Sequence, residues 1–428
     1  MSLQRMAHAL RLRFDSAFGR VEAAGRELAR EIDWRDLRPD RPTVLCLKRS
    51  TFIKDVEDIR RRGNFNLPLV RAARVKHAQE PWVAPEDRRQ TYFYHFLQTR
   101  LAPARADLAR FALAFLKEAL KTHPIDAVFA GNTDYWQDES VKIACKTLGI
   151  PFLVLGRENY SMGIDAINVL NRFRSANFRF NGAGVAVYSE ATQRTMIDSG
   201  SFPEGAVWVT GAPRFDHWID LKPLPDPERD MIMLINYSYP EGYLAPQNFI
   251  ETAKLFAAAA KRAPKDIVFA LKSKKFDEEA DARRLVPELN EAPIQYLCSE
   301  PLVDLYPRCR AVIGVNSLAV AEAFLAETAV IAPFWGDARR EPAECLLLRD
   351  DPDDVAATYF ADSPEELVAL LDRAAARDLP PKGDKAFRRK RFCRHIALPD
   401  EGTCADQVER YINHFIAAAR DTAARNAA

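Results

Sequence analysis

The sequence predicts an α/β protein built from two doubly wound, Rossmann-like domains that face each other across a cleft. Short, continuously apolar runs alternate with amphipathic helical segments, and a proline-rich stretch at 216–230 divides this alternation into two halves. Continuous apolar runs are typical of strands buried on both faces of a parallel sheet. Because such sheets bind ligands at the carboxyl ends of their strands, we expect the ligand between the two halves.

The first half contains five apolar runs that we expect to be strands. The helical pattern SVKIACKTLG, closed by Gly149 and Pro151, connects the second run to the third and makes a βαβ crossover. Residues 51–125 are expected to form helices over one sheet face, the last of them over 101–120. The expected strands are 44–47, 127–130, 152–155, 185–188 and 207–210.

After the proline-rich segment the alternation restarts, which predicts a second sheet. Its expected elements are strands at 232–235, 267–271 and 294–297, helices at 248–263 and 278–285, the strand–turn–helix–strand segment 311–336, and tail helices at 363–376 and 405–420. We therefore expect one domain at 1–220 and another at 221–395, with residues 396–428 crossing back to the first domain as a C-terminal helix.

Composition excludes several classes of protein. Of 428 residues, 61 are Lys or Arg and 60 are Asp or Glu, so the net charge of +1 creates no field that would collect nucleic acid. The seven cysteines are scattered and never form CxxC pairs, which argues against a disulfide framework and a structural zinc site. We expect reduced cysteines that serve mainly in packing.

The N-terminal segment is arginine-rich and lacks the apolar core of about 7–15 residues that a signal peptide needs. No apolar run reaches the length of about 18 residues that a membrane span requires. We therefore expect a cytoplasmic protein. Residues 3–14 also fit a basic amphipathic helix that contacts the inner face of a membrane, and packing of that helix on its own domain is the alternative.

The segment 311–336 predicts a seat for a phosphate. Asn316 and Ser317 stand where the first strand gives way to the helix, so free N–H groups and the positive end of the helix dipole would face the region beyond the strand. Glu322 follows in the helix, where its carboxylate could reach the hydroxyl groups of a ribose attached to that phosphate. The alternative for Glu322 is an ion pair with a basic neighbour.

Four segments together are typical of one known family: VTGAPRFD (209–216), INYSYP (235–240), AVIGVNSLAVAEAFLAETAVIAP (311–333) and LPDEGTCADQV (398–408). With these segments the sequence resembles a GT-B glycosyltransferase, and more narrowly the bacterial surface-carbohydrate and capsule transferases, whose layout is shared by UDP-GlcNAc 2-epimerases and glycerophosphotransferases. The resemblance covers residues 125–415. A glycine-rich loop after the first strand is missing; Arg49 and Ser50 would supply side-chain donors in its place.

Further donor-binding candidates lie at strand ends. Tyr237 and Ser238 could donate to a diphosphate or stack on a base, unless they form an ordinary turn. Lys272 would be the first of three lysines to emerge from its strand and could neutralise a leaving diphosphate, although a solvated charge run is the usual explanation of such a cluster. Arg214 in GAPRFD is a candidate ligand contact, with a structural role as the alternative.

The first half supplies the candidates for acceptor chemistry. A transferase that inverts the anomeric centre needs a base for the acceptor hydroxyl. Glu158 and then Asp134 are the candidate bases, because each follows a predicted strand, whereas Asp138 and Glu139 are expected only to stabilise the start of a helix. Aromatic faces suit sugar rings. We therefore expect acceptor contacts from Tyr135, Trp136 and Tyr160, although each could instead be buried.

The sequence lacks the motifs of several other enzyme classes. The sequence has no HExxH, no DxD near a strand end, and no GxSxG, Walker A or GxGxxG motif. We expect a metal-independent enzyme without a cofactor, whose nucleotide-sugar is a co-substrate.

The sequence thus indicates a glycosyltransferase in which the second domain holds a nucleotide-sugar donor and the first holds a glycan or lipid-linked acceptor. A nucleotide-sugar 2-epimerase or polyol-phosphate transferase of the same fold is one alternative. A non-catalytic sugar-nucleotide-binding partner in a glycan assembly complex is the other.

Overall fold

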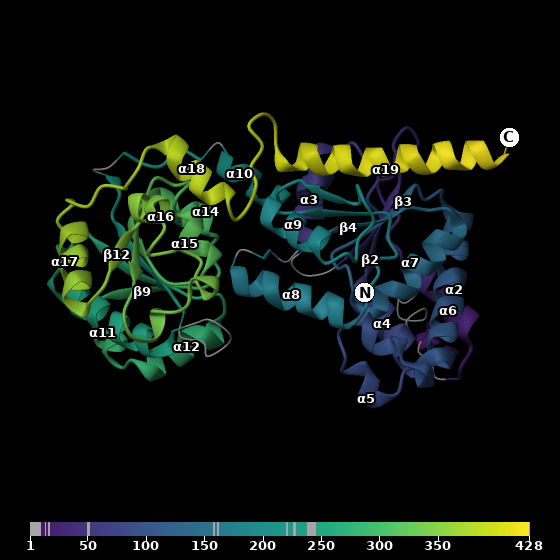
Figure 1. The fold of residues 1–428 in the computed structure, drawn as a ribbon, viewed down its shortest axis with the longest axis horizontal. Helices are drawn as coiled ribbons and strands as arrows, with labels where there is room; N and C mark the ends of the chain where they lie inside the picture. The colour runs from purple at the N-terminus through teal and green to yellow at the C-terminus, as the bar shows by residue number, and fades with distance from the viewer. Residues whose placement is uncertain are drawn as a thin grey trace. The chain divides into compact units, whose positions relative to one another are not determined.

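The structure is a computed structural model that describes residues 10–12, 14–15, 18–48, 52–156, 159–160, 162–219, 221–225, 228–237 and 245–427. The chain divides into two compact units (Figure 1). Unit 1 consists of Met1–Asn159, Asn168–Asp216 and Ala397–Ala428, and unit 2 of Tyr160–Ile167 and His217–Ile396. None of the described helices is both long enough and apolar enough to cross a membrane.

Unit 1 is built on a six-stranded sheet whose neighbouring strands are all parallel, in the order β2-β1-β3-β4-β5-β6. β3, β4 and β5 are buried at every position, as continuous apolar strands between two helical layers should be. The strands are β1 (Val44–Lys48), β2 (Leu69–Arg71), β3 (Ala127–Ala130), β4 (Phe152–Leu155), β5 (Gly184–Val187) and β6 (Val207–Val209).

Helices cover the unit 1 sheet. α2 packs along α6, and the C-terminal helix α19 lies against α3 and β5 (Figure 1). The helices are α2 (Val21–Ala29), α3 (Phe52–Arg62), α4 (Ala72–Gln79), α5 (Pro85–Arg88), α6 (Ala102–Thr122), α7 (Trp136–Leu148), α8 (Gly163–Ser175, which begins in unit 2), α9 (Glu190–Asp198) and α19 (Cys404–Ala427).

Unit 2 has its own six-stranded parallel sheet, in the order β9-β8-β7-β10-β11-β12. Numbered from its first strand, this is the order 3-2-1-4-5-6 of dinucleotide-binding Rossmann domains. The strands are β7 (Met231–Ile235), β8 (Val268–Lys272), β9 (Ile294–Leu297), β10 (Cys309–Ile313), β11 (Ala329–Pro333) and β12 (Tyr359–Ala361).

The core of unit 2 lies between this sheet and its helices. Phe249, Phe256 and Ala260 of α11 pack against apolar strand residues such as Leu234 and Phe269, and α17 packs beside α11 (Figure 1). The helices are α10 (Asp216–Ile219, at the boundary with unit 1), α11 (Pro246–Arg262), α12 (Phe276–Leu285), α13 (Glu288–Glu291), α14 (Leu302–Leu305), α15 (Leu318–Glu322), α16 (Pro352–Ala357), α17 (Pro364–Ala375) and α18 (Lys385–Cys393).

These two parallel sheets confirm the predicted fold class of two Rossmann-like domains. Two edge strands escaped prediction: β2, inside the stretch 51–125 that we expected to be helical, and β12. The helix expected after Ser317 is also shorter than its sequence suggests, because α15 ends at Glu322 and is followed by turns.

A buried histidine makes the stability of unit 2 dependent on pH. His395 is 5% exposed, and burial, assisted by the positive charges of Arg394 and Arg391, lowers its pKa to about 4. An unfolded histidine titrates near pH 6.5. Between these two pH values the unfolded chain takes up a proton that the folded chain does not, so stability falls as the pH falls.

We predict that acidification from pH 6.5 to 4 lowers the free energy of unfolding of the wild type by roughly 3 kcal/mol more than that of His395→Gln. Urea denaturation across this range measures the difference. The same substitution at the exposed His414 controls for the loss of a histidine elsewhere. Equal pH dependence in the wild type and His395→Gln would contradict the assignment.

Candidate functional site

The strand order of unit 2 makes the carboxyl ends of β7 and β10 the candidate position for a ligand. From β7 the chain proceeds outward to β8 and β9, and then returns to β10 on the other side of β7. In open α/β sheets this switch point leaves a crevice in which ligands bind. The segments that follow the two strands are residues 236 onward and Gly314–Ser317, so this edge collects several of the residues predicted from the sequence.

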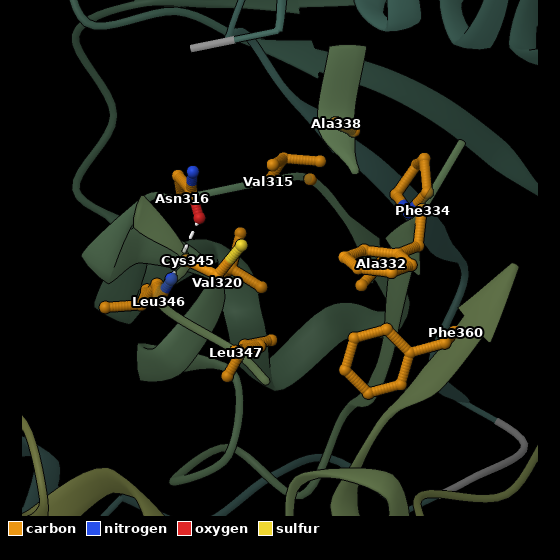
Figure 2. Close-up of a pocket in the computed structure, with 12 residues that line it drawn as sticks. Val315, Asn316, Val320, Ala332, Phe334, Ala338, Cys345, Leu346, Leu347 and Phe360 are labelled. Atoms are coloured by element: carbon orange, nitrogen blue, oxygen red, sulfur yellow. Dashed lines mark hydrogen bonds between the residues drawn. The ribbon is translucent and has the colours of Figure 1, made fainter. Parts of the chain in front are cut away.

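Asn316 shapes one wall of this edge. It adopts a left-handed conformation with φ of 50°, which asparagine tolerates better than most residues. Its Nδ2 donates to the carbonyl of Glu344 at 2.8 Å, and its Oδ1 accepts from the N–H of Leu346 at 2.9 Å. The side chain therefore points at the loop that follows β11 and holds it in place, as Figure 2 shows.

A small cavity lies beside Asn316. It measures about 20 Å³, and Figure 2 shows mainly apolar side chains around it, among them Val320, Phe334 and Phe360. This volume suits one water molecule or one methyl group. It is far too small for a nucleotide, so a donor would lie outside this cavity.

Ser317 begins α15 and offers polar groups toward the sheet edge. Its Oγ accepts from the N–H of Ala319 at 3.3 Å, which caps the helix. Among the described residues, no acceptor is bonded to the N–H groups of Ser317 and Leu318. Because α15 has only five residues, the macrodipole that we expected adds little, and these two amides and the serine hydroxyl remain as the donors.

Glu322 is the last residue of α15 and is half-buried. It lies near the buried Tyr306, whose pKa is raised well above its usual value, first by burial and then by the negative charge of Glu322. Glu322 thus lies at the C-terminal end of the short helix whose N-terminal end is formed by Ser317 and Leu318.

The N-terminus of α11, a second helix at this edge, is already bonded to a protein carboxylate. The two carboxylate oxygens of Asp337 accept from the N–H groups of Gln247 (3.0 Å) and Asn248 (2.7 Å), in the first turn of α11. In dinucleotide-binding Rossmann domains, the phosphate sits at the start of the helix after the first strand, which is the position of α11. Asp337 takes that place here. Nothing in the local sequence GDARR indicated this contact, because its partners lie 89 and 90 residues away.

Tyr237 lies under α11. It is 1% exposed, its hydroxyl donates to Oδ1 of Asn248 at 2.9 Å, and its ring meets Phe249 edge to face. Burial raises its pKa. The predicted role of Tyr237 in donor binding would require these contacts to change.

Lys272 is half-buried at the end of β8. Its Nζ donates to the carbonyls of Ser273 (3.1 Å) and Cys298 (2.8 Å), and burial lowers its pKa. The ammonium group thus ties the end of β8 to the segment that follows β9, which occupies two of its three donors.

In unit 1 the corresponding switch point lies between β1 and β3, since the order β2-β1-β3 changes direction there. Asp134 follows β3 and is 3% exposed. Its carboxylate is paired with Arg172 of α8 at 3.3 Å and accepts from the hydroxyl of Thr133 at 3.3 Å. Arg172 also donates to the hydroxyl of Tyr92 at 2.8 Å and lies over its ring.

Sequence reasoning missed Arg172 and Tyr92, because they lie far from Asp134 in the chain. The ion pair with Arg172 places a positive charge beside the buried carboxylate of Asp134.

The three predicted acceptor contacts are divided between the two units. Tyr135 is half-buried and meets Tyr92 edge to face. Trp136 is 1% exposed and stacks on Phe96, and its Nε1 has no hydrogen-bond partner among the described residues. Tyr160 is 7% exposed and belongs to unit 2.

A buried ion pair supports the loop that carries Asp134. Lys142 has no exposed surface; it donates to Glu139 at 2.8 Å and to the carbonyl of Thr133. Asn181 donates to the other carboxylate oxygen of Glu139. Glu139 thus has a structural partner as well as its place in the first turn of α7.

Arg214 belongs to a buried network in unit 1. Its guanidinium donates to Oδ2 of Asp55 at 3.0 Å and to the hydroxyl of Tyr188 at 2.8 Å, and its backbone N–H donates to Oδ1 of Asp55 at 3.0 Å. Asp55 has no exposed surface, and burial raises its pKa in opposition to the charge of Arg214. The arrangement fixes GAPRFD against α3.

Four residues of the sequence-based predictions lie outside the described residues: Glu158, Ser238, Arg49 and Ser50. Their predicted roles remain predictions. Within the described part of the chain, no group of three or more His, Cys, Asp or Glu residues is placed to hold a metal ion.

No known protein family and no curated protein matches the sequence. Among solved structures, the chain is similar to Anabaena Alr3699/HepE in complex with UDP and glucose (14% identity, TM-score 0.45, covering 87% of this chain and 100% of that chain). It is also similar to the UDP-GlcNAc 2-epimerase from Neisseria meningitidis bound to UDP-GlcNAc (12%, 0.48, 87% and 100%). A third is a UDP-forming trehalose-phosphate synthase from Burkholderia xenovorans (12%, 0.44, 90% and 99%). At TM-scores below 0.5, function has to be inferred from this chain's own residues.

We predict that Arg214→Met lowers the free energy of unfolding by roughly 3 kcal/mol, because it leaves the carboxylate of Asp55 buried without its cation. The double variant Asp55→Asn/Arg214→Met should recover part of that loss, since the unpaired charge is then gone. Urea denaturation of the four proteins measures the coupling. A role in ligand contact would show the opposite pattern, with stability unchanged and nucleotide binding weakened.

Proposed function

We propose that the protein is a glycosyltransferase of the GT-B type, which moves a sugar from a nucleotide-sugar donor to a glycan or lipid-linked acceptor. The observation that carries the proposal is the switch point of unit 2. There the N–H groups of Ser317 and Leu318, which bond no acceptor among the described residues, and the hydroxyl of Ser317 lie at the end of β10, while Asp337 occupies the start of α11.

The donor would bind in unit 2. Its diphosphate would accept from the amides of Ser317 and Leu318, and Glu322 would bind the ribose hydroxyls. Asn316 supports this arrangement indirectly by holding the loop at 344–346. Lys272, Tyr237, Ser238 and Arg214 remain candidate donor contacts. For the first two and Arg214, each such role competes with the protein contacts described above.

The acceptor would bind in unit 1, near Asp134 and Tyr135, with Trp136 and Tyr160 as further candidates. The acceptor oxygen would attack the anomeric carbon, the bond from that carbon to the diphosphate oxygen would break, and a carboxylate would take the acceptor proton. Asp134 or Glu158 would be that base. Asp134 is supported by its position after β3, at the switch point of the unit 1 sheet.

The proposal extends to the setting of the reaction. The protein would act in surface-polysaccharide or capsule biosynthesis, in the cytoplasm or at the inner face of a membrane, without a metal ion. These points rest on the sequence motifs quoted above, since fold alone does not assign a substrate.

We predict that one of the UDP, GDP, CMP, CDP or dTDP compounds raises the melting temperature. At a concentration about a hundred times its Kd, the gain is about 2.7 kcal/mol, or roughly 5–10 °C for a domain of this size. Ser317→Ala should reduce that shift by at least half. Thermal denaturation with and without each nucleotide measures it.

Ser363→Ala is the matched control. Ser363 caps α17 of the same unit as Ser317 caps α15. Both variants lose a cap worth about 1 kcal/mol, but only Ser317→Ala should lose nucleotide stabilisation. Equal shifts in the two variants, or no shift with any nucleotide, would refute the donor site.

Activity assays on the wild type and on Asp134→Asn distinguish glycosyl transfer from epimerisation and from binding without reaction. With the stabilising nucleotide-sugar and a glycan or lipid-linked acceptor, the wild type should release the nucleoside diphosphate, and Asp134→Asn should lose transfer but keep the thermal shift. Conversion of UDP-GlcNAc without an acceptor would identify an epimerase instead. A thermal shift without any turnover would identify a binding module.

A further inference from the structure

Three large apolar side chains near the N-terminal end of unit 1 are exposed to solvent. Leu10 is 64% exposed, Phe14 49% and Phe18 67%. Apolar residues scattered singly over a surface are common, but these three are spaced four residues apart, so they share one face of a helix. They form what we call the N-terminal apolar face.

The local backbone supports this grouping. Residues 10–12 and 14–15 are helical, and the N–H of Phe18, which lies in a turn, donates to the carbonyl of Phe14 at 3.0 Å, which is the i to i−4 bond of a helical turn. The rings of Phe14 and Phe18 lie 4.4 Å apart. Leu12, which falls on the opposite side of the helix, is 3% exposed. Because Leu12 anchors this segment in unit 1, the N-terminal apolar face is turned outward.

Positive charge accompanies the N-terminal apolar face. Arg11 is exposed, and the guanidinium of Arg20 lies 5.4 Å from the ring centre of Phe14. Residues 1–20 contain four arginines (5, 11, 13 and 20) and one acidic residue, Asp15, for a net charge of +3. The whole chain carries only +1, so the remaining residues sum to −2. The excess of positive over negative charge in the sequence therefore lies within residues 1–20.

We infer that the N-terminal apolar face binds the surface of an anionic lipid bilayer. Exposed aromatic and aliphatic side chains on one face, flanked by arginines, are the features of helices that lie in the interfacial region of a membrane. Arginine attracts anionic headgroups while the apolar side chains leave water. A second copy of this chain would bring the same excess of positive charge, which disfavours self-association through this face.

This surface would bring unit 1 to a membrane, where a lipid-linked acceptor would be found. The inference names the membrane-contacting surface within the proposed function, but it needs no substrate for its test. Failure of vesicle binding would therefore leave the nucleotide measurements on unit 2 untouched, and failure of nucleotide binding would leave this surface untouched.

The experiment uses the full chain and sedimentation with vesicles. Wild type is mixed with vesicles of phosphatidylcholine alone or of phosphatidylcholine with phosphatidylglycerol, at low and high salt. Phe14→Ser/Phe18→Ser removes the apolar contribution and Arg11→Glu reverses one charge. Phe276→Ser is the matched control, because Phe276 is 71% exposed, follows two lysines and lies in unit 2.

The wild type and Phe276→Ser should bind the anionic vesicles, and high salt should weaken that binding. Phe14→Ser/Phe18→Ser should bind about tenfold more weakly, with an unchanged melting temperature, since both side chains are exposed. Arg11→Glu should also weaken binding. Absence of wild-type binding, equal binding by Phe14→Ser/Phe18→Ser, or a loss only in Phe276→Ser would overturn the inference. So would light scattering that shows a dimer disrupted by the double variant.

Discussion

The strand order of unit 2 is the constraint on which the account of the site depends. In a sheet ordered β9-β8-β7-β10-β11-β12, the connections that leave β7 and β10 run in opposite directions. In open α/β sheets such a reversal leaves a crevice at the carboxyl ends of the two strands. Because crossovers between parallel strands are right-handed, connections that run in opposite directions lie on opposite faces of the sheet. The strand order therefore places Ser317 at the switch point. The local sequence decides only which polar groups lie there.

Several polar groups at this edge of the sheet already form hydrogen bonds within the protein. Asp337 caps α11, and Asn316 secures the loop at 344–346 through both ends of its amide. Each contact satisfies backbone groups that would otherwise be left without partners near a buried sheet edge. Under the proposed function, the start of α15 is therefore the position that we assign to the anion. Polar residues near a site can thus matter by fixing the geometry around a ligand rather than by touching it.

The sequence predicts the interior of both sheets well and their edges poorly. Continuous apolar runs such as Ala127–Ala130 are recognisable because both faces are buried. β2 and β12 have three residues each, too few for any periodicity to show. The local sequence also gave no indication that α15 ends at Glu322. Arg388 donates to the carbonyls of Ala323 (2.9 Å) and Phe324 (3.1 Å), which lie just beyond that end and are 65 and 64 residues away from it in the sequence.

The candidate site shows the same division. Strand ends can be recognised in the sequence, so a candidate location at the carboxyl ends of the strands could be predicted from it. The contacts of single residues depend on partners distant in sequence, as Arg214 and Asp55 illustrate. The central claim is that a nucleotide binds at the start of α15 and not at the start of α11. Amide hydrogen exchange, measured with and without the stabilising nucleotide, tests this claim most directly. The account predicts slower exchange at Ser317 and Leu318, with Gln247 and Asn248 unchanged. Protection confined to Gln247 and Asn248 would contradict it.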